Sequence, residues 1–375
     1  MNKSIIHCTI SPCDNERRIF NEAFTASKNG YQVAIVALKT PDLPVYSTVN
    51  SIPLERIAIK NWQGGPLKFL LFNLKLFFSL MHKNFQILHC HDLWVLPAAA
   101  LAVCLKRGRL VYDAHEYYRD LEIFQKKKIS GFLWAVAEWI FIRKAEVVIV
   151  INRHHLEFFR RSYPFLKQVV VLMNYPFLTD YPSEKSEIGF DGRENKIIFQ
   201  GILKQGRGLP ALIQSMEKVE TGTLEIIGHG ELESELRKLV AAKNLQNLIF
   251  FKGKMEWDKM LRETGKCRAG LVLFQSHTKN YAHASPNKFF EYVMTGTPVI
   301  ASDIVTFQEF NTEFEVAVLV PPDSIDEISS AIRTLLNDQF TWKRLHENCI
   351  KARKKWNWEA QENVLLDMYQ QVLLS

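Results

Sequence analysis

Short apolar, β-rich runs alternate with amphipathic helical patterns along the whole chain, and this alternation occurs twice. In the first half, strand-like runs lie at 4–10, 32–38, 87–90, 109–114, 146–151 and 169–173, with helical patterns at 16–29 and 95–106. In the second half they lie at 196–201, 223–228, 248–253, 269–274 and 298–302, with helical patterns at 208–219, 231–243, 257–266 and 286–294. Alternation of this kind predicts parallel sheets covered by helices.

The segment 174–195 interrupts the alternation and is rich in proline, glycine, serine and charge. Such a segment is typical of a domain boundary, and 375 residues suit two domains of roughly 100–200 residues each. The sequence therefore predicts an α/β protein with two doubly wound, Rossmann-like domains. Ligands of such sheets bind beyond the carboxyl ends of the strands, so we expect the active site in a cleft between the domains.

The composition excludes several classes of protein. The six cysteines form no CxxC pair, which argues against a zinc ribbon or a secreted disulfide scaffold and favours a reducing compartment. The N-terminal apolar run is too short for a signal peptide, and no stretch reaches the ~18 apolar residues of a transmembrane helix. We therefore expect a cytoplasmic protein.

The net charge of +7 is concentrated in the first half. Residues 1–180 hold 23 Lys and Arg against 14 Asp and Glu, whereas the remainder is slightly acidic. No basic stripe with a reading motif is evident, so nucleic acid is not an expected partner. The basic half suits a phosphorylated substrate or an anionic membrane surface, although scattered surface lysines would give the same count.

The most informative run is HASPNKFFEYVMTGTPVIASD, which begins at position 283. Ser285 is expected to cap a helix whose first position is Pro286. The helix N-terminus would bind phosphate, with Lys288 as an added cation. Glu291 lies one turn on, on the side of Asn287 and Lys288, where its carboxylate can accept two ribose hydroxyls. A surface Lys288–Glu291 ion pair is the alternative.

This run resembles the signature of glycosyltransferase family 4, whose members are retaining enzymes of the GT-B fold that use nucleotide-sugar donors. The signature has two acids eight positions apart, followed by a small residue, Gly, a variable residue and Pro-Val. Glu291 takes the second acidic place, and His283 stands in the first. The resemblance implies a UDP-sugar more than a GDP-sugar as the donor, with His283 contacting the sugar.

The resemblance continues in FQGILKQGRGLPALIQSM, the opening loop of the family's C-terminal domain. Gly201, Arg207 and Gly208 keep the family's spacing, but Ile202 stands where an arginine is common. The resemblance implies that Arg207 and Lys288 hold the donor pyrophosphate. A solvated loop arginine is the alternative reading of Arg207.

Two further segments of the second half resemble donor-binding segments of the family. IIGHGELESEL carries the family's Gly-x-Gly turn, whose second glycine is Gly230. FFKGK resembles the segment beside the nucleotide base, which makes Phe251 and Lys252 candidates. A plain strand end is an equal reading of the second segment.

The first half resembles the same family at two strand ends. HCHDLWVLPAA places His91 and Asp92 at one of them, and LVYDAHEYY places Asp113, His115 and Glu116 at the next. The resemblance assigns His115 to the transferred sugar, and His91, Asp92 and Glu116 become candidates on the acceptor side. Any one of them alone could be an ordinary loop hydrogen-bonding residue.

The first loop, SPCDNERRIF, departs from the family, in which paired glycines are common. Asp14 and Asn15 stand there as acceptor-side candidates. Either could instead cap the helix that begins near Glu16. We expect Cys13 to be a passive residue, because no base is paired with it.

Two apolar helices bear on location. The helix at 66–83 has one narrow polar stripe, and the helix at 126–144 follows three lysines and is interrupted by Glu138. Such helices can lie on a bilayer, or they can pack in the core of a doubly wound domain.

The combined interpretation is a cytoplasmic, peripherally membrane-associated glycosyltransferase. It would move a sugar with retention from a nucleotide-diphosphate sugar to a glycan or lipid-linked acceptor in cell-surface polysaccharide or glycoconjugate assembly. The acceptor domain would span 1–178 and the donor domain 190–355, with a C-terminal helix over 356–375 crossing back to the first domain. No cofactor or metal is expected, since no Asp-x-Asp stretch occurs. The alternatives are a GT-B epimerase or hydrolase, and a catalytically weak subunit of a glycan-assembly complex.

Overall fold

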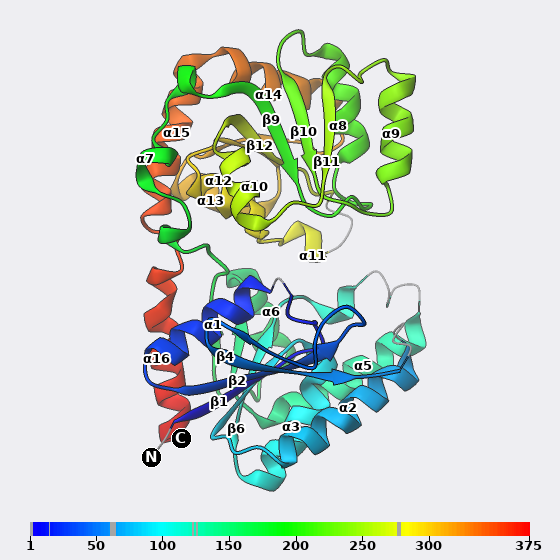
Figure 1. Cartoon of the computed structure of the whole chain (residues 1–375), viewed down its shortest axis with the longest axis vertical. Coiled ribbons are helices and arrows are strands. Elements are labelled where there is room, and N and C mark those ends of the chain that lie inside the picture. The colour runs from blue at the N-terminus through cyan, green and yellow to red at the C-terminus, as the bar shows by residue number, and fades with distance from the viewer. Residues whose placement is uncertain (1–2, 15, 61–64, 122–123, 125–126, 276–278) are drawn as a thin grey trace. The chain divides into compact units, whose positions relative to one another are not determined.

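The computed structural model describes residues 3–14, 16–60, 65–121, 124, 127–275 and 279–375. The chain divides into two compact units (Figure 1). Unit 1 comprises residues 1–174 and 361–375, and unit 2 comprises residues 175–360. Each unit has a central, mainly parallel sheet with helices on its faces, which confirms the predicted α/β two-domain fold.

The sheet of unit 1 has eight strands in the order β3-β4-β2-β1-β5-β6-β7-β8. The strands are β1 (Ser4–Cys8), β2 (Gln32–Lys39), β3 (Tyr46–Val49), β4 (Ile52–Ala58), β5 (Ile87–His91), β6 (Arg109–Ala114), β7 (Ala145–Val150) and β8 (Val169–Val171). Its helices are α1 (Arg17–Lys28), α2 (Pro66–Met81), α3 (Leu96–Lys106), α5 (Lys128–Phe141), α6 (Arg153–Ser162) and the greater part of α16 (Glu359–Leu374).

The sheet of unit 2 has six parallel strands in the order β11-β10-β9-β12-β13-β14, which is the Rossmann order 3-2-1-4-5-6. The strands are β9 (Glu194–Gln200), β10 (Thr223–Ile227), β11 (Ile249–Gly253), β12 (Cys267–Val272), β13 (Val299–Ser302) and β14 (Ala317–Val320). The helices are α7 (Ser183–Ser186), α8 (Leu209–Ser215), α9 (Glu233–Ala242), α10 (Trp257–Thr264), α11 (Lys279–Ala282), α12 (Asn287–Met294), α13 (Val305–Glu313), α14 (Ile325–Asn337) and α15 (Gln339–Arg353).

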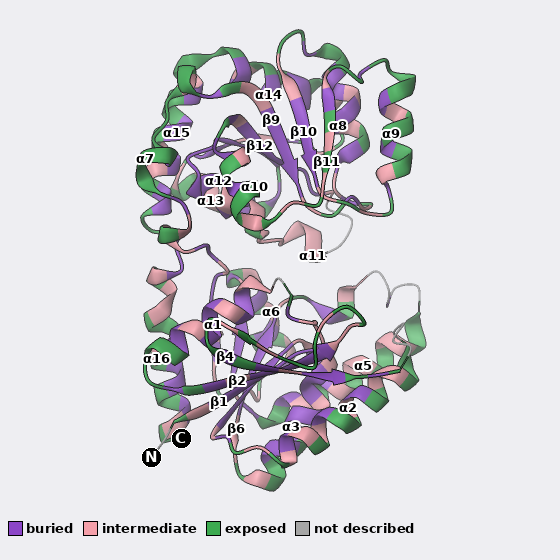
Figure 2. Ribbon diagram, in the orientation of Figure 1, coloured by how far each residue is buried: buried purple, intermediate pink, exposed green. Residues whose placement is uncertain are grey.

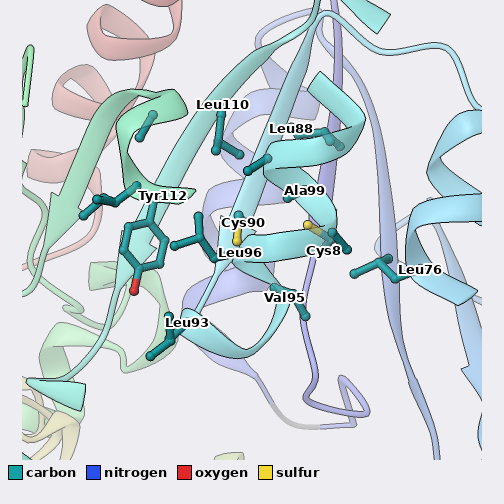
Figure 3. Packing of buried hydrophobic residues seen from close by; sticks show 14 of the residues in the cluster. Cys8, Leu76, Leu88, Cys90, Leu93, Val95, Leu96, Ala99, Leu110 and Tyr112 are labelled. Atoms are coloured by element: carbon teal, nitrogen blue, oxygen red, sulfur yellow. The ribbon is translucent and has the colours of Figure 1, made fainter. Parts of the chain in front are cut away.

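Side-chain alternation gives the sheet of unit 1 two different faces. Cys8, Cys90 and Tyr112 point into an apolar core with residues of α2 and α3, among them Leu76 and Leu96 (Figure 3). Because successive side chains of a strand point to opposite faces, the neighbours of these residues form the other face. Those neighbours are His7, His89, His91 and Asp113, and all four are fully buried.

The predicted Ser285 cap is wrong, and Asp14 does not cap the helix that follows it. Helix α12 begins at Asn287, so Pro286 rather than Ser285 occupies the cap position, and no side chain caps it. Helix α1 begins at Arg17, and its cap residue is Glu16 rather than Asp14, again without a side-chain cap. The Glu16 carboxylate instead accepts a hydrogen bond from the Ser11 hydroxyl at 2.6 Å, which ties the loop before the helix.

Figure 2 shows that the strands are mostly buried, whereas the outer sides of α2 and α5 are exposed. Within the described part of the chain, no helix has both the length and the apolar character needed to cross a bilayer.

Candidate functional site

The order of strands in unit 2 reverses between β9 and β12, and ligands of such sheets bind at this switch point. Gly201 directly follows β9 with φ of +140°, a conformation that favours glycine. A Cβ at this position would lie 2.9 Å from Nζ of Lys288. The backbone after β9 is therefore shaped to let the Lys288 ammonium lie against it.

Three cationic side chains gather at this point. Burial and the nearby charges of Arg207 and Lys204 together lower the pKa of Lys288 to about 8, against the opposing effect of Glu291. The Arg207 guanidinium stacks 4.2 Å from the ring centre of Phe274 and 5.7 Å from that of Tyr281. Repulsion among cations held in one place is relieved when an anion binds between them.

Arg207 and Lys204 also line a hollow of about 260 Å³. Its wall includes Gly208 and the side chains of Gln275 and Asp323. Lys204 was not singled out from the sequence, because the family's common arginine is expected two positions earlier. Ile202 occupies that earlier position and is exposed, while Lys204 supplies a second loop cation beside Arg207.

The Glu291 carboxylate is held by two donors. The Gln200 side-chain amide donates to Oε2, and the Trp257 indole donates to Oε1 at 3.2 Å. A carboxylate offers about four acceptor positions, so two remain for a ligand. This geometry differs from the alternative of a simple Lys288–Glu291 surface pair, because Glu291 is partly buried and already oriented.

The other donor-side candidates have varied surroundings. A Cβ at Gly208 would lie 2.7 Å from Cβ of Leu273, and one at Gly230 would lie 2.2 Å from the Leu203 carbonyl oxygen, so both glycines have a packing role. The Arg237 guanidinium lies 4.4 Å from the ring centre of Phe251, and Nζ of Lys252 lies 3.5 Å from Oε1 of Glu225. Phe251 and Lys252 both stand on the edge strand β11.

The remaining candidates of unit 2 surround the start of α12. His283, Ser285 and Pro286 are half-buried and lie between α11 and α12, while Asn287 is exposed at the first position of α12. Of this run, Lys288 lies beside Gly201 at the switch point.

Unit 1 has a second polar cluster, centred on Asp113 at the end of β6. Nε and Nη2 of Arg18 donate to its two oxygens at 2.6 and 2.8 Å. Nδ1 of His91 lies 3.2 Å and Nε2 of His115 lies 2.8 Å from Oδ2. Burial would raise the pKa of Asp113, but Arg18 and His115 outweigh it and hold that pKa well below its usual value.

His115 stands between two carboxylates. Its Nδ1 lies 3.2 Å from Oδ1 of Asp92, which also accepts a hydrogen bond from the Tyr118 hydroxyl. Burial would lower the pKa of His115, but Asp92 and Asp113 outweigh it and raise the pKa to about 9. His115 is therefore an imidazolium at neutral pH, oriented on both nitrogens and about one quarter exposed.

Behind this cluster lie His7, His89 and Glu22. Nδ1 of His7 lies 2.9 Å from Nε2 of His91, and Nε2 of His89 lies 3.4 Å from Oε2 of Glu22. His7, Glu22, His89 and His91 each have one ligand atom within 4.8 Å of the others, a spacing that could admit a metal ion. Both nitrogens of His91 are engaged, by His7 and by Asp113. Among the described residues, Nε2 of His7, Nε2 of His89 and both carboxylate oxygens of Glu22 are buried without a hydrogen-bond partner.

Sequence reasoning expected His91, Asp92, Asp113, His115 and Glu116 to share adjacent strand ends. The first four do share one cluster, whereas Glu116 is exposed. Asp14 is also exposed, and Asn15 lies outside the described residues.

Both halves of the chain match family models. Residues 180–356 match the model described as Glycosyl transferases group 1. Residues 16–174 match the model described as Glycosyltransferase Family 4. The first match covers the strands that carry the Lys288 site, and the second covers most of the strands that carry the Asp113 cluster.

Two curated relatives are similar at low identity. The O-antigen chain mannosyltransferase C of Escherichia coli is 25% identical over 47% of this chain and 45% of its own length. A phosphatidyl-myo-inositol mannosyltransferase of Mycobacterium leprae is 24% identical over 92% of this chain and 90% of its own length. The chain thus spans less than half of the first relative and nearly all of the second.

Two solved structures share the fold. Sucrose-phosphate synthase of Thermosynechococcus elongatus superposes with a TM-score of 0.78 at 18% identity, over 100% of both chains. Anabaena HepE, solved with UDP and glucose, superposes with a TM-score of 0.74 at 14% identity, over 99% of this chain and 100% of its own.

Two Rossmann-like units, one with a cation-rich switch point, define the architecture of the GT-B class. The chain therefore has the fold of the GT-B glycosyltransferases, and its two halves match the models described as Glycosyltransferase Family 4 and Glycosyl transferases group 1.

Proposed function

We propose that the chain transfers a sugar, with retention of configuration, from a nucleotide-diphosphate sugar to a glycan or lipid-linked acceptor in the assembly of a cell-surface polysaccharide or glycoconjugate. The transferred sugar would be a hexose or an N-acetylhexosamine. The observation that carries the proposal is the switch point of unit 2, where Lys204, Arg207 and Lys288 lie near a carboxylate with two open acceptor positions. The three cations would bind the diphosphate, and the oriented carboxylate would accept the ribose hydroxyls. The two features together therefore fit one nucleotide diphosphate.

Each residue then has a role in the transfer. The bond between the anomeric carbon and the diphosphate oxygen breaks, and an acceptor hydroxyl adds on the same face while its proton passes to the departing phosphate. Arg207 and Lys288 stabilise the charge that grows on the diphosphate. Glu291 holds the ribose, and His115 and His283 contact the transferred sugar. No cofactor is required, and UDP is favoured over GDP, in line with the UDP in the HepE structure.

We expect Glu291→Gln to weaken UDP binding by ~1.5–3 kcal/mol, the range for hydrogen bonds to charged groups. The amide keeps the size of the side chain but removes the charge and one acceptor oxygen. Calorimetric titration with UDP measures the change, and Glu217→Gln is the control because that carboxylate only pairs with Lys243 at the surface. Equal UDP affinity in a folded Glu291→Gln variant would remove the ribose role.

The pH dependence of UDP binding should follow Lys288. Its lowered pKa of about 8 means that its charge is lost in the free protein as the pH rises past that value. UDP affinity measured by calorimetry should therefore decline between pH 7 and 9.5, and Lys288→Arg should flatten the decline because arginine stays charged. A wild-type affinity that is constant over this range would show that Lys288 does not contact the diphosphate.

The acceptor side of the proposal includes location. We propose that the chain acts in the cytoplasm as a peripheral protein on an anionic membrane surface. The support is the apolar outer side of α2 and α5, which Lys127 and Lys128 flank. A hydrophobic helix face bordered by cations suits a bilayer interface.

Flotation with vesicles tests this location. Binding should grow with the content of anionic phosphatidylglycerol and fall with salt, because each lysine near the surface adds ~1 kcal/mol. Phe132→Glu, on the outer side of α5, should abolish flotation, while Phe340→Glu on unit 2 should not, although both side chains are exposed. Equal recovery with neutral and anionic vesicles would contradict an electrostatic contribution to membrane binding.

The comparisons do not favour the two alternatives. The matched models describe transferases, which leaves an epimerase or a hydrolase without support. A catalytically weak subunit was suggested by Ile202 and His283, but Lys204 supplies a cation near the position that Ile202 leaves neutral.

A further inference from the structure

Helix α5 buries its acidic residue and exposes apolar side chains. Its one acidic residue, Glu138, is buried and accepts hydrogen bonds from the hydroxyls of Tyr163 and Tyr112 at 2.6 and 3.1 Å. The residues spaced three and four apart on its other side are apolar and exposed, namely Ile129, Phe132, Leu133, Val136 and Ile140. A helix that packs its acid against the protein and exposes its apolar side requires an apolar partner.

An apolar groove of about 870 Å³ lies between α5 and α2. Its volume is within the ~300–1,000 Å³ of ligand pockets. Aromatic rings pack along it, since Trp94 lies 5.0 Å from Trp134 and 5.1 Å from Phe69 between ring centres. The Asn73 amide donates to the Trp94 carbonyl at 2.9 Å and fixes α2 against this floor. The groove is therefore held open by specific contacts.

The rings behind the groove lead to the Asp113 cluster. Trp94 packs on Tyr118 with ring centres 6.1 Å apart, and the Tyr118 hydroxyl donates to Asp92. Asp92 in turn contacts His115. One aromatic pair thus separates the apolar groove from the carboxylate and imidazolium that were predicted to lie on the acceptor side.

The groove has a cationic end. Lys127 and Lys128 line it at the N-terminus of α5, where the helix dipole also favours a negative charge. Within the described residues, no acidic side chain lines the groove. Its chemistry therefore matches a hydrocarbon chain that bears an anionic group.

We propose that this groove binds the hydrocarbon chain of a phosphate-bearing acceptor lipid. The chain lies along Phe69, Leu133 and Trp134, and the phosphate pairs with Lys127 and Lys128. The sugar-accepting end is then directed past Tyr118 toward Asp92 and His115. This inference rests on the proposed glycosyl transfer and names its acceptor class.

Calorimetric titration of the full chain with dodecyl phosphate, kept below its micelle concentration, tests the groove. We expect saturable binding with one site, whereas butyl phosphate should not bind, because each buried methylene adds ~0.8 kcal/mol. Leu133→Glu should weaken dodecyl phosphate binding at least tenfold. The matched control is Leu105→Glu on α3, because Leu133 and Leu105 are 61% and 66% exposed and Leu105 does not line the groove.

The anionic end is tested with Lys127→Ala and Lys128→Ala, each of which should weaken dodecyl phosphate binding about fivefold. Equal affinity in the Leu133→Glu and Leu105→Glu variants would overturn the proposal, and so would the absence of saturable binding. Equal binding of dodecyltrimethylammonium would overturn the phosphate assignment.

UDP titration of the same proteins separates this proposal from the proposed function. If the wild-type chain binds UDP but not dodecyl phosphate, only the assignment of the groove is contradicted. If the chain binds dodecyl phosphate but no nucleotide diphosphate, the proposed glycosyl transfer is contradicted, and with it the acceptor assignment that rests on it.

Discussion

Lys288→Ala should lower the turnover number for sugar transfer by about 10²–10³-fold, the usual cost of removing one preorganised group that stabilises developing charge. Its ammonium lies against the backbone of Gly201, half-buried and beside Arg207 and Lys204. Because the charge on the diphosphate grows as the sugar leaves, the loss should appear more in kcat than in KM. Steady-state kinetics with the preferred nucleotide sugar measures it.

The control for this prediction is Lys243→Ala, which removes a lysine of the same unit that pairs with Glu217 at 3.0 Å on the surface. This variant should keep the wild-type turnover number. A Lys288→Ala enzyme with unchanged kcat and a raised KM would make Lys288 a ground-state binding residue only.

Asp113→Ala should lower the free energy of unfolding of unit 1 by about 3–5 kcal/mol, since it removes the carboxylate that accepts two hydrogen bonds from the buried Arg18 guanidinium. Arg18 and Asp113 are both nearly inaccessible, and Asp113 also receives His91 and His115. Chemical denaturation followed by circular dichroism measures the loss. Asp326→Ala removes an exposed pair with Lys218 and should leave the denaturation midpoint unchanged.

A double-mutant cycle shows whether the loss comes from this pair. The combined Arg18→Met and Asp113→Asn variant should lose clearly less free energy of unfolding than the sum of the two single losses. The reason is that the double variant lacks both charges of the pair, whereas each single variant keeps one. Additive losses would contradict the assignment to the Arg18–Asp113 interaction.

The same cluster predicts a dependence of stability on pH. The pKa of His115 is about 9 in the folded chain and ~6.5 in the unfolded chain, so its contribution is full below ~6.5 and is lost as the pH rises through 9. Asp92→Asn should reduce this dependence, since Asp92 is the nearby charge that raises the pKa of His115 most. Titration of His115 by NMR is the direct measurement.

Most of the parallel strands were predictable because they are buried apolar runs between helical patterns, but the edge strand β14 was not predicted. The hairpin of β3 and β4 was not predicted either, since it turns through Asn50 and Ser51, with φ of 48° and 67°, and lacks the glycine that usually marks such a turn. Pro53 within β4 further hid the strand. Local sequence signals therefore failed where the turn residues were atypical.

The donor-side candidates could be read from one continuous run and one loop, because their spacing is local. The Asp113 cluster could be read only in part. Arg18 reaches Asp113 across 95 positions, and Tyr369 reaches His89 across 280. The available signals were the histidines on one face of β1 and β5, and Arg18 and Glu22 one turn apart on α1.

We propose that this chain moves sugar from a nucleotide-diphosphate sugar to a lipid-linked acceptor. The most direct measurement supplies radiolabelled UDP-sugars and GDP-sugars, with a total membrane lipid extract, to the purified full chain and counts label in the organic phase. We expect label from at least one donor to enter the organic phase with the wild-type chain and to fall to background with Lys288→Ala. Label that stays on the nucleotide, or that is released only as free sugar, with every donor would contradict it.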